Sequence, residues 1–329
     1  MQRIAITGSS GHYGRRLVEH IRQESPDSKI LGIDVVPPKP EYAPHEFVSH
    51  DIRSSDVRTT LANFQPDTIM HLAFVVNPIR DLKLMHDINV NGTRNVFEAV
   101  RAIRPQRFLM ASSATAYGAW DDNPIPMDES WPLRARDDFQ YSSDKFVNDA
   151  AVQKLGEELP DVAVSWTRPT VIVGPTIDNY LTRLVLHLPV MFLLDGVDTP
   201  LQWVHEDDCV AATWAILKHS ARGPFNISPP DWVPMSKVAK LTKRRHMKIP
   251  FWCAKLATTV WWGMRLPIFD FPASLHDFVR YPWVITPDRL TKELGFEFKY
   301  SAEDTLKVMW HAHQQRRGRM EGGRGSKSL

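Results

Sequence analysis

A glycine-rich turn directly after a short apolar segment is the feature that most restricts how this chain can fold. The segment Arg3–Thr7 has the length and composition of a buried strand, and Gly8, Gly11 and Gly14 follow it. A helical pattern begins at Tyr13. Glycines at this spacing allow a tight turn, a close approach of backbone to a ligand, and close packing of helix on strand. Because the N–H groups at a helix N-terminus attract phosphate, the turn predicts a dinucleotide site.

The first half of the chain alternates strand-like and helical segments. The expected strands are Arg3–Thr7, Lys29–Asp34, Glu46–His50, Thr68–Ala73, Arg107–Ser112 and Val162–Arg168. The expected helices are Tyr13–Glu24, Asp56–Phe64, Asp81–Ile103 and Ser142–Leu159. This alternation predicts an α/β fold, in which a parallel sheet is covered by helices on both faces and binds ligands at the carboxyl ends of its strands.

The alternation of strand-like and helical segments ends after Pro169, where prolines and tryptophans become frequent. The expected helices there are Asp207–His219, Met235–Arg245, Trp252–Met264, Pro287–Leu294 and Ala302–Gln315. We therefore expect a nucleotide-binding domain over residues 1–175 and a smaller, mostly helical substrate lobe over 176–313, with segments near 201–228 returning to the main sheet. Residues 314–329, rich in Arg, Gly and Ser, are expected to be a disordered basic tail.

Composition excludes several classes of function. The formal net charge of +2 does not indicate a chain that binds nucleic acid through a large basic surface. The two cysteines are too few for a disulfide framework, so a reduced, cytoplasmic setting is expected. No charge-free apolar segment approaches the roughly 20 residues of a membrane span. His71, His205 and His246 lack the spacing of metal ligands, so no metal site is predicted.

An acidic residue at the end of the second expected strand predicts which dinucleotide is bound. Asp34 lies 20 residues after Gly14 and is followed by Val35, Val36 and Pro37 rather than by an arginine. A carboxylate at this point accepts hydrogen bonds from ribose hydroxyls and repels a 2′-phosphate. The sequence therefore favours NAD over NADP.

A phenol and an ammonium four residues apart form the candidate catalytic group. Tyr141 and Lys145 lie on one face of an expected helix, and Ser112 and Ser113 end the fifth expected strand. The pKa of a free tyrosine is about 10, and Lys145 together with an oxidised nicotinamide ring is expected to lower it. Ser113 is expected to hold a substrate hydroxyl beside Tyr141, whose phenol exchanges a proton with it.

Together these motifs resemble the extended short-chain dehydrogenases/reductases of the NAD-dependent epimerase/dehydratase family, and in particular the UDP-glucose 4-epimerases. Besides the glycine turn, the matching segments are Asp51–Ile52, His71–Ala73, Asn89–Thr93, Ser112–Gly118, Tyr141–Lys145, Arg168–Pro175, Val204–Asp208 and Glu293–Phe296. The resemblance implies a Rossmann-type, doubly wound parallel sheet. It also implies that Ser113, Tyr141 and Lys145 are catalytic, and that Asn89 braces the site.

The resemblance further implies a cofactor site on both sides of the glycine turn. Asp51 and Ile52 would flank the adenine, Lys145 would bind the nicotinamide ribose, and Pro169 would lie beside the nicotinamide amide. The complete implied set is Gly8, Gly11, His12, Tyr13, Gly14, Asp34, Asp51, Ile52, Leu72, Ala73, Ser112, Tyr141, Lys145 and Pro169.

The residues after Ser113 favour one reaction of the family. Ala114 and Thr115 stand where the dehydratases and decarboxylases carry acids, so epimerisation of a nucleotide sugar through a keto intermediate is the leading expectation. The arginine that usually meets the diphosphate is replaced by Gln202, although Arg183 or Arg280 could supply a cation. The candidate substrate-binding residues are Thr115, Asn179, Gln202 and Arg280.

Two alternatives come from the second lobe. Bulky residues there suit a dehydrogenase or reductase of a hydrophobic, steroid-like or polyketide-like alcohol, although packing in the core of the helical lobe is the favoured explanation for them: Phe251, Trp252, Trp261, Trp262, Phe269 and Phe271. The same Trp-rich segment beside Lys243–Arg245 suits a non-catalytic or membrane-peripheral protein, although the complete catalytic group argues against this. A homodimer that pairs through the Asp81–Ile103 and Tyr141–Leu159 helices is expected from the family.

Overall fold

A parallel seven-stranded sheet forms the body of the protein. The computed structural model describes residues 1–77, 79–177, 190–263 and 275–325, with the side chains of 261–263 and 317–325 left out. The strand order is β11-β6-β5-β4-β1-β2-β3. The strands are β1 (Arg3–Thr7), β2 (Lys29–Asp34), β3 (Glu46–Ser49), β4 (Thr68–His71), β5 (Arg107–Ala111), β6 (Ala163–Pro169) and β11 (Gly223–Ile227). The α/β fold and the six strands expected in the first half are confirmed.

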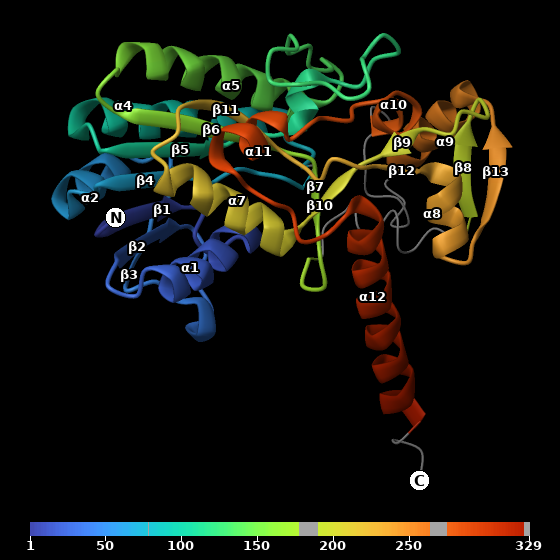
Figure 1. Cartoon of the computed structure of the whole chain (residues 1–329), viewed down its shortest axis with the longest axis horizontal. Coiled ribbons are helices and arrows are strands. Elements are labelled where there is room, and N and C mark those ends of the chain that lie inside the picture. Colours follow the sequence, from blue (N-terminus) through green and yellow to red (C-terminus); the bar gives the residue numbers. More distant parts are fainter. Residues whose placement is uncertain (78, 178–189, 264–274, 326–329) are drawn as a thin grey trace.

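Helices cover both faces of this sheet, because successive strand residues point to opposite sides (Figure 1). Ala5 of β1 packs with the helices of one face, whereas Ile4 and Ile6 pack with those of the other. The first face carries α2 (Asp56–Phe64), α4 (Gly92–Ile103) and α5 (Gln140–Glu158). The second carries α1 (His12–Glu24), α7 (Glu206–Lys218) and α11 (Asp288–Leu294). Each fully buried aliphatic side chain stabilises this sandwich by roughly 1.5–3 kcal/mol.

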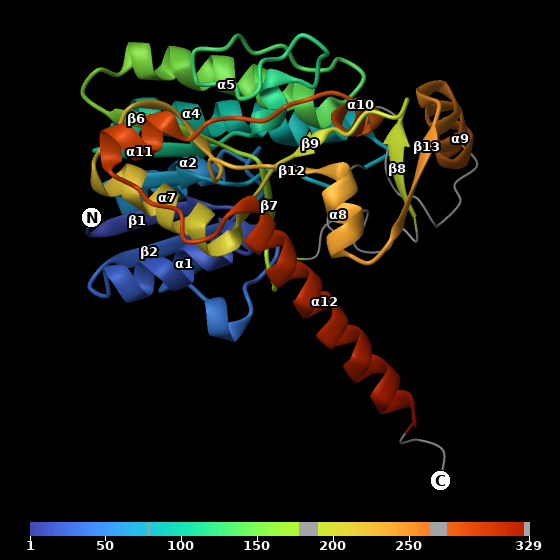
Figure 2. The same ribbon diagram turned by 45° about the vertical axis from the view of Figure 1, so that its right-hand side comes forward.

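The second lobe contains three small two-stranded sheets beside helices, and Figure 2 shows them beyond the carboxyl edge of the main sheet. The strands pair as β7 (Val171–Val173) with β10 (Trp203–His205), β9 (Pro200–Leu201) with β12 (Val233–Pro234), and β8 (Val190–Leu194) with β13 (Arg245–Ile249). The helices are α8 (Met235–Leu241), α9 (Phe251–Gly263), α10 (Leu275–Arg280) and α12 (Ala302–Gly325). Short helical turns also occur at η1 (Pro40–Tyr42) and η3 (Ala114–Tyr117).

Several expected elements differ from the structure. The expected helix Asp81–Ile103 is divided into α3 (Leu82–His86), a π-helical turn η2 (Asp87–Asn91) and α4. Of the two segments expected to return to the main sheet, Pro224–Ile227 does so as part of β11, whereas Leu201–Val204 is divided between β9 and β10 of the small sheets.

Two further expected boundaries are wrong. The expected helix Met235–Arg245 ends early, at Leu241, because the chain turns at Lys243, whose φ is +54°, into β13. Helix α12 continues past the expected end at Gln315 to Gly325, and Figure 1 shows this helix projecting from the body.

Candidate active site

A cavity of about 1020 Å³ lies at the carboxyl ends of the main strands and extends into the second lobe. Its lining includes the glycine turn after β1, Leu72 after β4, Ser112 and Ser113 after β5, and Pro169 at the end of β6. The opposite wall comes from the small sheets and from α9 and α10. The cavity is therefore at the position that parallel α/β folds use for ligands.

The glycine turn has the geometry of a phosphate cradle. Gly8 has a φ of +73°, and a Cβ on it would lie 2.5 Å from the Ala73 nitrogen. A Cβ on Gly14 would lie 2.2 Å from the Gly8 oxygen, so neither position accepts a larger residue without distortion. Gly11 caps α1 without a side-chain acceptor for the first N–H groups of the helix, and residues of the first helical turn line the cavity. These N–H groups are available to an anion.

The other predicted cofactor residues fall into two groups. Ten line the cavity: Gly8, Gly11, His12, Tyr13, Gly14, Leu72, Ser112, Tyr141, Lys145 and Pro169. Four do not: Asp34, Asp51, Ile52 and Ala73. Asp34 accepts a hydrogen bond of 3.0 Å from the Ser10 nitrogen, which places its carboxylate next to the turn. Asp51 forms an ion pair of 2.6 Å with Arg53, and Ile52 is buried against Gly92.

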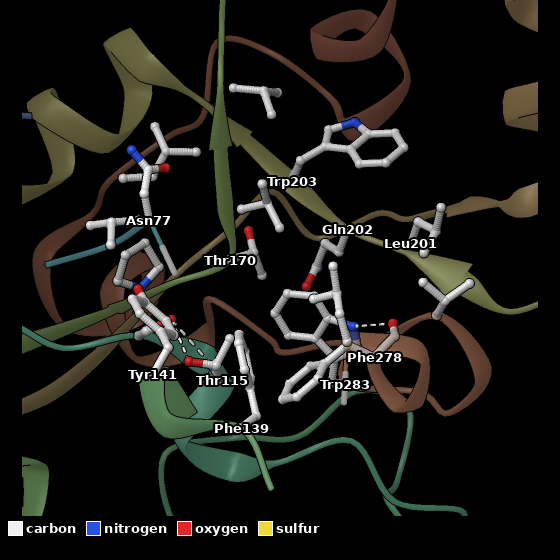
Figure 3. A pocket seen from close by; sticks show the side chains of 18 of the residues that line it. Asn77, Thr115, Phe139, Tyr141, Thr170, Leu201, Gln202, Trp203, Phe278 and Trp283 are labelled. Atoms are coloured by element: carbon white, nitrogen blue, oxygen red, sulfur yellow. Dashed lines mark hydrogen bonds between the residues drawn. The ribbon is translucent and has the colours of Figure 1, made fainter. Parts of the chain in front are cut away.

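The three predicted catalytic side chains meet in this cavity. Ser113 follows β5, and its hydroxyl accepts a hydrogen bond of 3.0 Å from the Thr115 hydroxyl. Tyr141 and Lys145 project from the first turns of α5. Figure 3 shows Tyr141 and Thr115 together on one side of the cavity. A substrate hydroxyl in contact with Ser113 would therefore also reach the phenol.

Burial shifts the pKa values of the two titratable catalytic candidates, Lys145 and Tyr141. Burial lowers the pKa of Lys145 to about 7, although Asp149 and Asp144 oppose this shift. The Lys145 ammonium donates a hydrogen bond of 2.7 Å to the Ala111 carbonyl and lies 3.6 Å from the centre of the Phe74 ring. Burial raises the pKa of Tyr141 to about 12, partly offset by a hydrogen bond with Ser113. In the protein without NAD, desolvation therefore outweighs the lowering expected from Lys145, and the lowering expected from an oxidised nicotinamide ring stays a prediction.

Buried hydrogen bonds fix the orientation of α5. Asp144 has no exposed surface and accepts hydrogen bonds from His86 (2.7 Å), Gln140 (2.8 Å) and Asn89 (3.0 Å). The Asn89 side chain also accepts a hydrogen bond of 2.8 Å from the Val75 nitrogen, which agrees with a bracing role. Because Asp144 immediately precedes Lys145, this network holds the ammonium in position.

A second buried group lies one turn further along α5. Asp149 binds the guanidinium of Arg168 at 2.6 Å and accepts hydrogen bonds from Ser112 (2.7 Å) and Trp166 (2.8 Å). The Arg168 pair ties α5 to β6, and the Ser112 contact ties it to the end of β5. The hydroxyl of Ser112 is therefore used within the protein, although the residue lines the cavity.

Aromatic rings surround the position where a substrate carbinol would lie. Phe74 contacts Tyr141 edge to face, with ring centres 5.4 Å apart. On the other side, Phe139 lies 5.8 Å from Tyr141 and 5.4 Å from Phe278, which in turn lies 5.4 Å from Trp283. Figure 3 shows the latter rings grouped below Thr170 and Gln202. We call Phe139, Phe278 and Trp283 the aromatic wall.

The predicted substrate residues are only partly brought into this site. Thr115 lines the cavity. Gln202 also lines it, but its amide nitrogen donates to Pro229, Asp231 and Ile285 carbonyls and its oxygen accepts from the Ile285 nitrogen. Arg280 is absent from the described lining and pairs with Asp195 at 3.1 Å. Asn179 and Arg183 lie outside the described residues.

Comparison with known proteins decides the family. The sequence model of the NAD-dependent epimerase/dehydratase family matches residues 4–228, well over half of the chain. The chain belongs to this family. An uncharacterised protein of Mycobacterium tuberculosis strain H37Rv is 24% identical over 314 residues, covering 92% of this chain and 82% of that one. An L-arabinose 1-dehydrogenase of Haloferax volcanii is 32% identical over 114 residues, covering 34% and 41%.

Solved structures of the same fold agree with the family assignment. The UDP-glucose 4-epimerase of Thermotoga maritima, solved with UDP-glucose, has a TM-score of 0.74 at 15% identity and covers 96% of this chain and 100% of its own. A short-chain dehydrogenase/reductase superfamily protein of Agrobacterium tumefaciens, solved with NAD, has a TM-score of 0.75 at 18% identity and covers 97% and 99%. The extended short-chain dehydrogenase/reductase fold is thus confirmed.

NAD is the cofactor of this epimerase/dehydratase family, and the residues of the cavity fit it. The uncapped helix start and the glycine cradle suit the pyrophosphate. Thr170, beside Pro169, has a buried hydroxyl with no hydrogen-bond partner among the described residues and lines the same cavity, so a polar ligand group can bind there. Among the described residues, the structure contains no helix with the length and apolar character needed to cross a bilayer.

Sequence reasoning missed the rings that shape the site of this family member. Phe74 directly follows the matched segment His71–Ala73, and Phe139 lies two residues before Tyr141, so their positions next to motifs were available as a signal. Phe278 and Trp283 carry no such signal, since an apolar residue in a helical lobe has the same pattern in a core and in a cavity wall.

Proposed function

We propose that this epimerase/dehydratase family protein is an oxidoreductase that moves a hydride between NAD and the carbinol carbon of a bulky, mainly apolar secondary alcohol or the corresponding ketone. The observation that carries the proposal is the lining of the cavity. Lys145 is the sole lysine or arginine among its described lining residues, and none of these residues is Asp or Glu. The apolar alcohol, the alternative in the sequence analysis, thus becomes the leading substrate class.

The hydrogen bonds of the polar side chains that line the cavity favour an apolar substrate. The Trp283 indole donates to the Phe278 carbonyl at 3.0 Å, and the Trp203 indole donates to the Ala302 carbonyl. Gln202 is saturated by backbone groups. A site that accepts many polar substituents needs free donors and acceptors, because an unpaired buried polar group costs about 1–3 kcal/mol. The substrate-facing part of this cavity is built mainly for apolar surface.

The chain's own residues handle the proton. In the direction of reduction, Tyr141 donates its proton to the substrate oxygen, and a pKa of about 12 keeps the phenol protonated at neutral pH until then. Ser113 holds the same oxygen, and Thr115 orients Ser113 by donating to it. Bound NAD supplies the hydride donor or acceptor and, when oxidised, a positive ring that favours the phenolate. Lys145 is positioned by Ala111 to bind the ribose of the cofactor.

Epimerisation of a nucleotide sugar is the second candidate. Ala114 and Thr115 follow Ser113, so the acids required for dehydration are missing from that position, and both uses of the trio begin with the same proton and hydride transfers. The similarity to the fold of a UDP-glucose 4-epimerase supports it. The lack of arginine in the described lining weighs against it, because a diphosphate is best bound by guanidinium groups.

The test compares two substrates with one base variant. Purified protein with NAD is given a hydroxysteroid or UDP-galactose, and both NADH and sugar interconversion are followed. NADH formed in proportion to a ketosteroid supports the proposal, whereas interconversion of UDP-galactose without accumulated NADH supports the second candidate. Tyr141→Phe should lower kcat by roughly 100-fold or more while NAD binding is retained.

Tyr300→Phe is the matched control for the base variant. This residue stacks on His205 at 3.9 Å and does not line the cavity as described, so removal of its hydroxyl should leave kcat unchanged. A Tyr141→Phe protein as active as Tyr300→Phe would refute the assignment of the base.

A further inference from the structure

Helix α9 has two faces, and both are mostly apolar. The inward face contributes to the cavity through Cys253, Ala254, Ala257 and Thr258. The outward face carries Trp252, Leu256 and Val260, which are 67%, 57% and 47% exposed. Their spacing of four residues places them in one stripe along the helix. Exposed large apolar side chains gathered in a stripe mark a surface that contacts something other than water.

Basic residues lie close to this stripe along the chain. Segment 232–263 contains seven lysines and arginines and no Asp or Glu, although the whole chain has a net charge of only +2. Strand β13 lies beside α9 in both views of the ribbon (Figure 1 and Figure 2). It exposes Arg245, Met247 and Lys248 to solvent, and neither cation forms an ion pair with a described residue.

The chemistry of this surface fits an anionic membrane. Tryptophan and aliphatic side chains enter the region between lipid headgroups and acyl chains, and flanking lysines and arginines bind anionic headgroups. A second copy of the chain fits poorly, because pairing two of these faces would bring like charges together. Helix α9 is too short to cross a bilayer but long enough to lie on one.

We propose that α9 and β13 form a docking surface for anionic membranes, with Trp252, Leu256 and Val260 inserted at the lipid interface. Ala257 is exposed and also lines the cavity, so the cavity opens beside the same helix. A lipid-dissolved alcohol or ketone can then enter the cavity from the membrane. This route for the substrate rests on the proposed function, whereas the docking surface does not.

The test is sedimentation of the full chain with vesicles of phosphatidylcholine alone or with about one-third phosphatidylglycerol. Wild type should sediment with the anionic vesicles, and added salt should release it. Leu256→Asp should lower the partition coefficient by roughly tenfold or more, since it places an anion at the inserted face. Leu82→Asp is the matched control, because Leu82 is 52% exposed on α3 and should bind as wild type does.

A second variant keeps the test independent of the α9 substitution. Arg245→Glu with Lys248→Glu should weaken binding by at least about fivefold for each cation removed. The proposal is overturned if wild type stays in the supernatant with anionic vesicles, or if Leu256→Asp sediments as wild type does. A concentration-dependent dimer that Leu256→Asp disrupts without vesicles would assign the surface to a second copy, and would also overturn it.

Activity toward a detergent-solubilised hydroxysteroid separates this proposal from the proposed function. Activity without vesicle binding would refute the docking surface alone. Vesicle binding without turnover of any alcohol or ketone would refute the proposed function and leave the docking surface standing.

Discussion

The buried ammonium of Lys145 should make the stability of the protein depend on pH in the alkaline range. This side chain is only 3% exposed, and burial is the largest cause of its pKa shift from 10.5 to about 7. Each unit of pKa shift corresponds to about 1.4 kcal/mol, so the shift amounts to about 5 kcal/mol. Substitution of Lys145 by methionine, which has a similar length and no charge, tests this value.

The free energy of unfolding should increase with pH, because the pKa of Lys145 is lower in the folded protein than in the unfolded chain. Between pH 7 and 10.5 the unfolded chain keeps a proton on Lys145 that the folded protein has released. The contribution of this group to the free energy of unfolding therefore rises with pH through that window, and below pH 7 it is constant and unfavourable. Methionine removes this dependence, but it also leaves the Ala111 carbonyl without its 2.7 Å donor, a pH-independent loss of about 1–3 kcal/mol.

The measurement is urea unfolding of wild type and Lys145→Met at intervals from pH 6 to pH 10. The free energy of unfolding of the variant minus that of wild type should fall by about 4 kcal/mol from pH 6 to pH 10, because most of the window between the two pKa values lies in this range. A difference that changes by less than about 1 kcal/mol would show that Lys145 is protonated in the folded protein at alkaline pH. The conclusion that desolvation dominates at this site would then be refuted.

Two other predictions concern His71 and Asp34. Burial lowers the pKa of His71 to about 3, and the imidazole lies between the hydroxyls of Thr7 (2.7 Å) and Thr93 (2.9 Å). The unfolded chain binds the extra proton between pH 6.5 and 3, so the free energy of unfolding should fall by up to about 5 kcal/mol as pH decreases through this window. His71→Asn should show a shallower loss in urea titrations, and an equally steep loss would contradict the assignment. Asp34→Ser should shift the ratio of NAD to NADP dissociation constants by at least about tenfold toward NADP. An unchanged ratio, measured by fluorescence titration, would mean that another residue reads the ribose.

The sheet was predictable from sequence because each of its strands is a short β-rich apolar segment between turn residues. The division of the expected helix Asp81–Ile103 was not, because the π-helical turn Asp87–Asn91 changes the hydrogen bonding of the backbone without changing the apolar pattern. The pairing of β8 with β13 was also missed, since its partners lie more than 50 residues apart and β13 is largely polar and exposed.

The site was predictable where chemistry requires a particular residue type. Glycines at the cofactor turn, and Ser113, Tyr141 and Lys145, are each tied to a function that few other residues perform. The direction of the pKa shift of Tyr141 was not predictable, because it depends on how completely the fold excludes water from the phenol. The aromatic wall was missed for a related reason, since its rings meet Tyr141 only after distant segments fold together.

The pairing of strand β11 with β6 means that part of the substrate-facing lobe is inserted between two neighbouring strands of the main sheet. The polypeptide leaves the main sheet at β6, contributes β7 to β10 and α7, and then returns at β11, which pairs with β6 through Gly223–Ile227. Many residues that line the cavity, from Thr170 to Trp203, thus belong to a long insertion between two adjacent strands of the sheet. A recombinant fragment that stops at residue 175 would lose an edge strand and the α7 cover of one sheet face. Conversely, exchange of the inserted segment offers a route to new substrate preferences on an unchanged nucleotide-binding base.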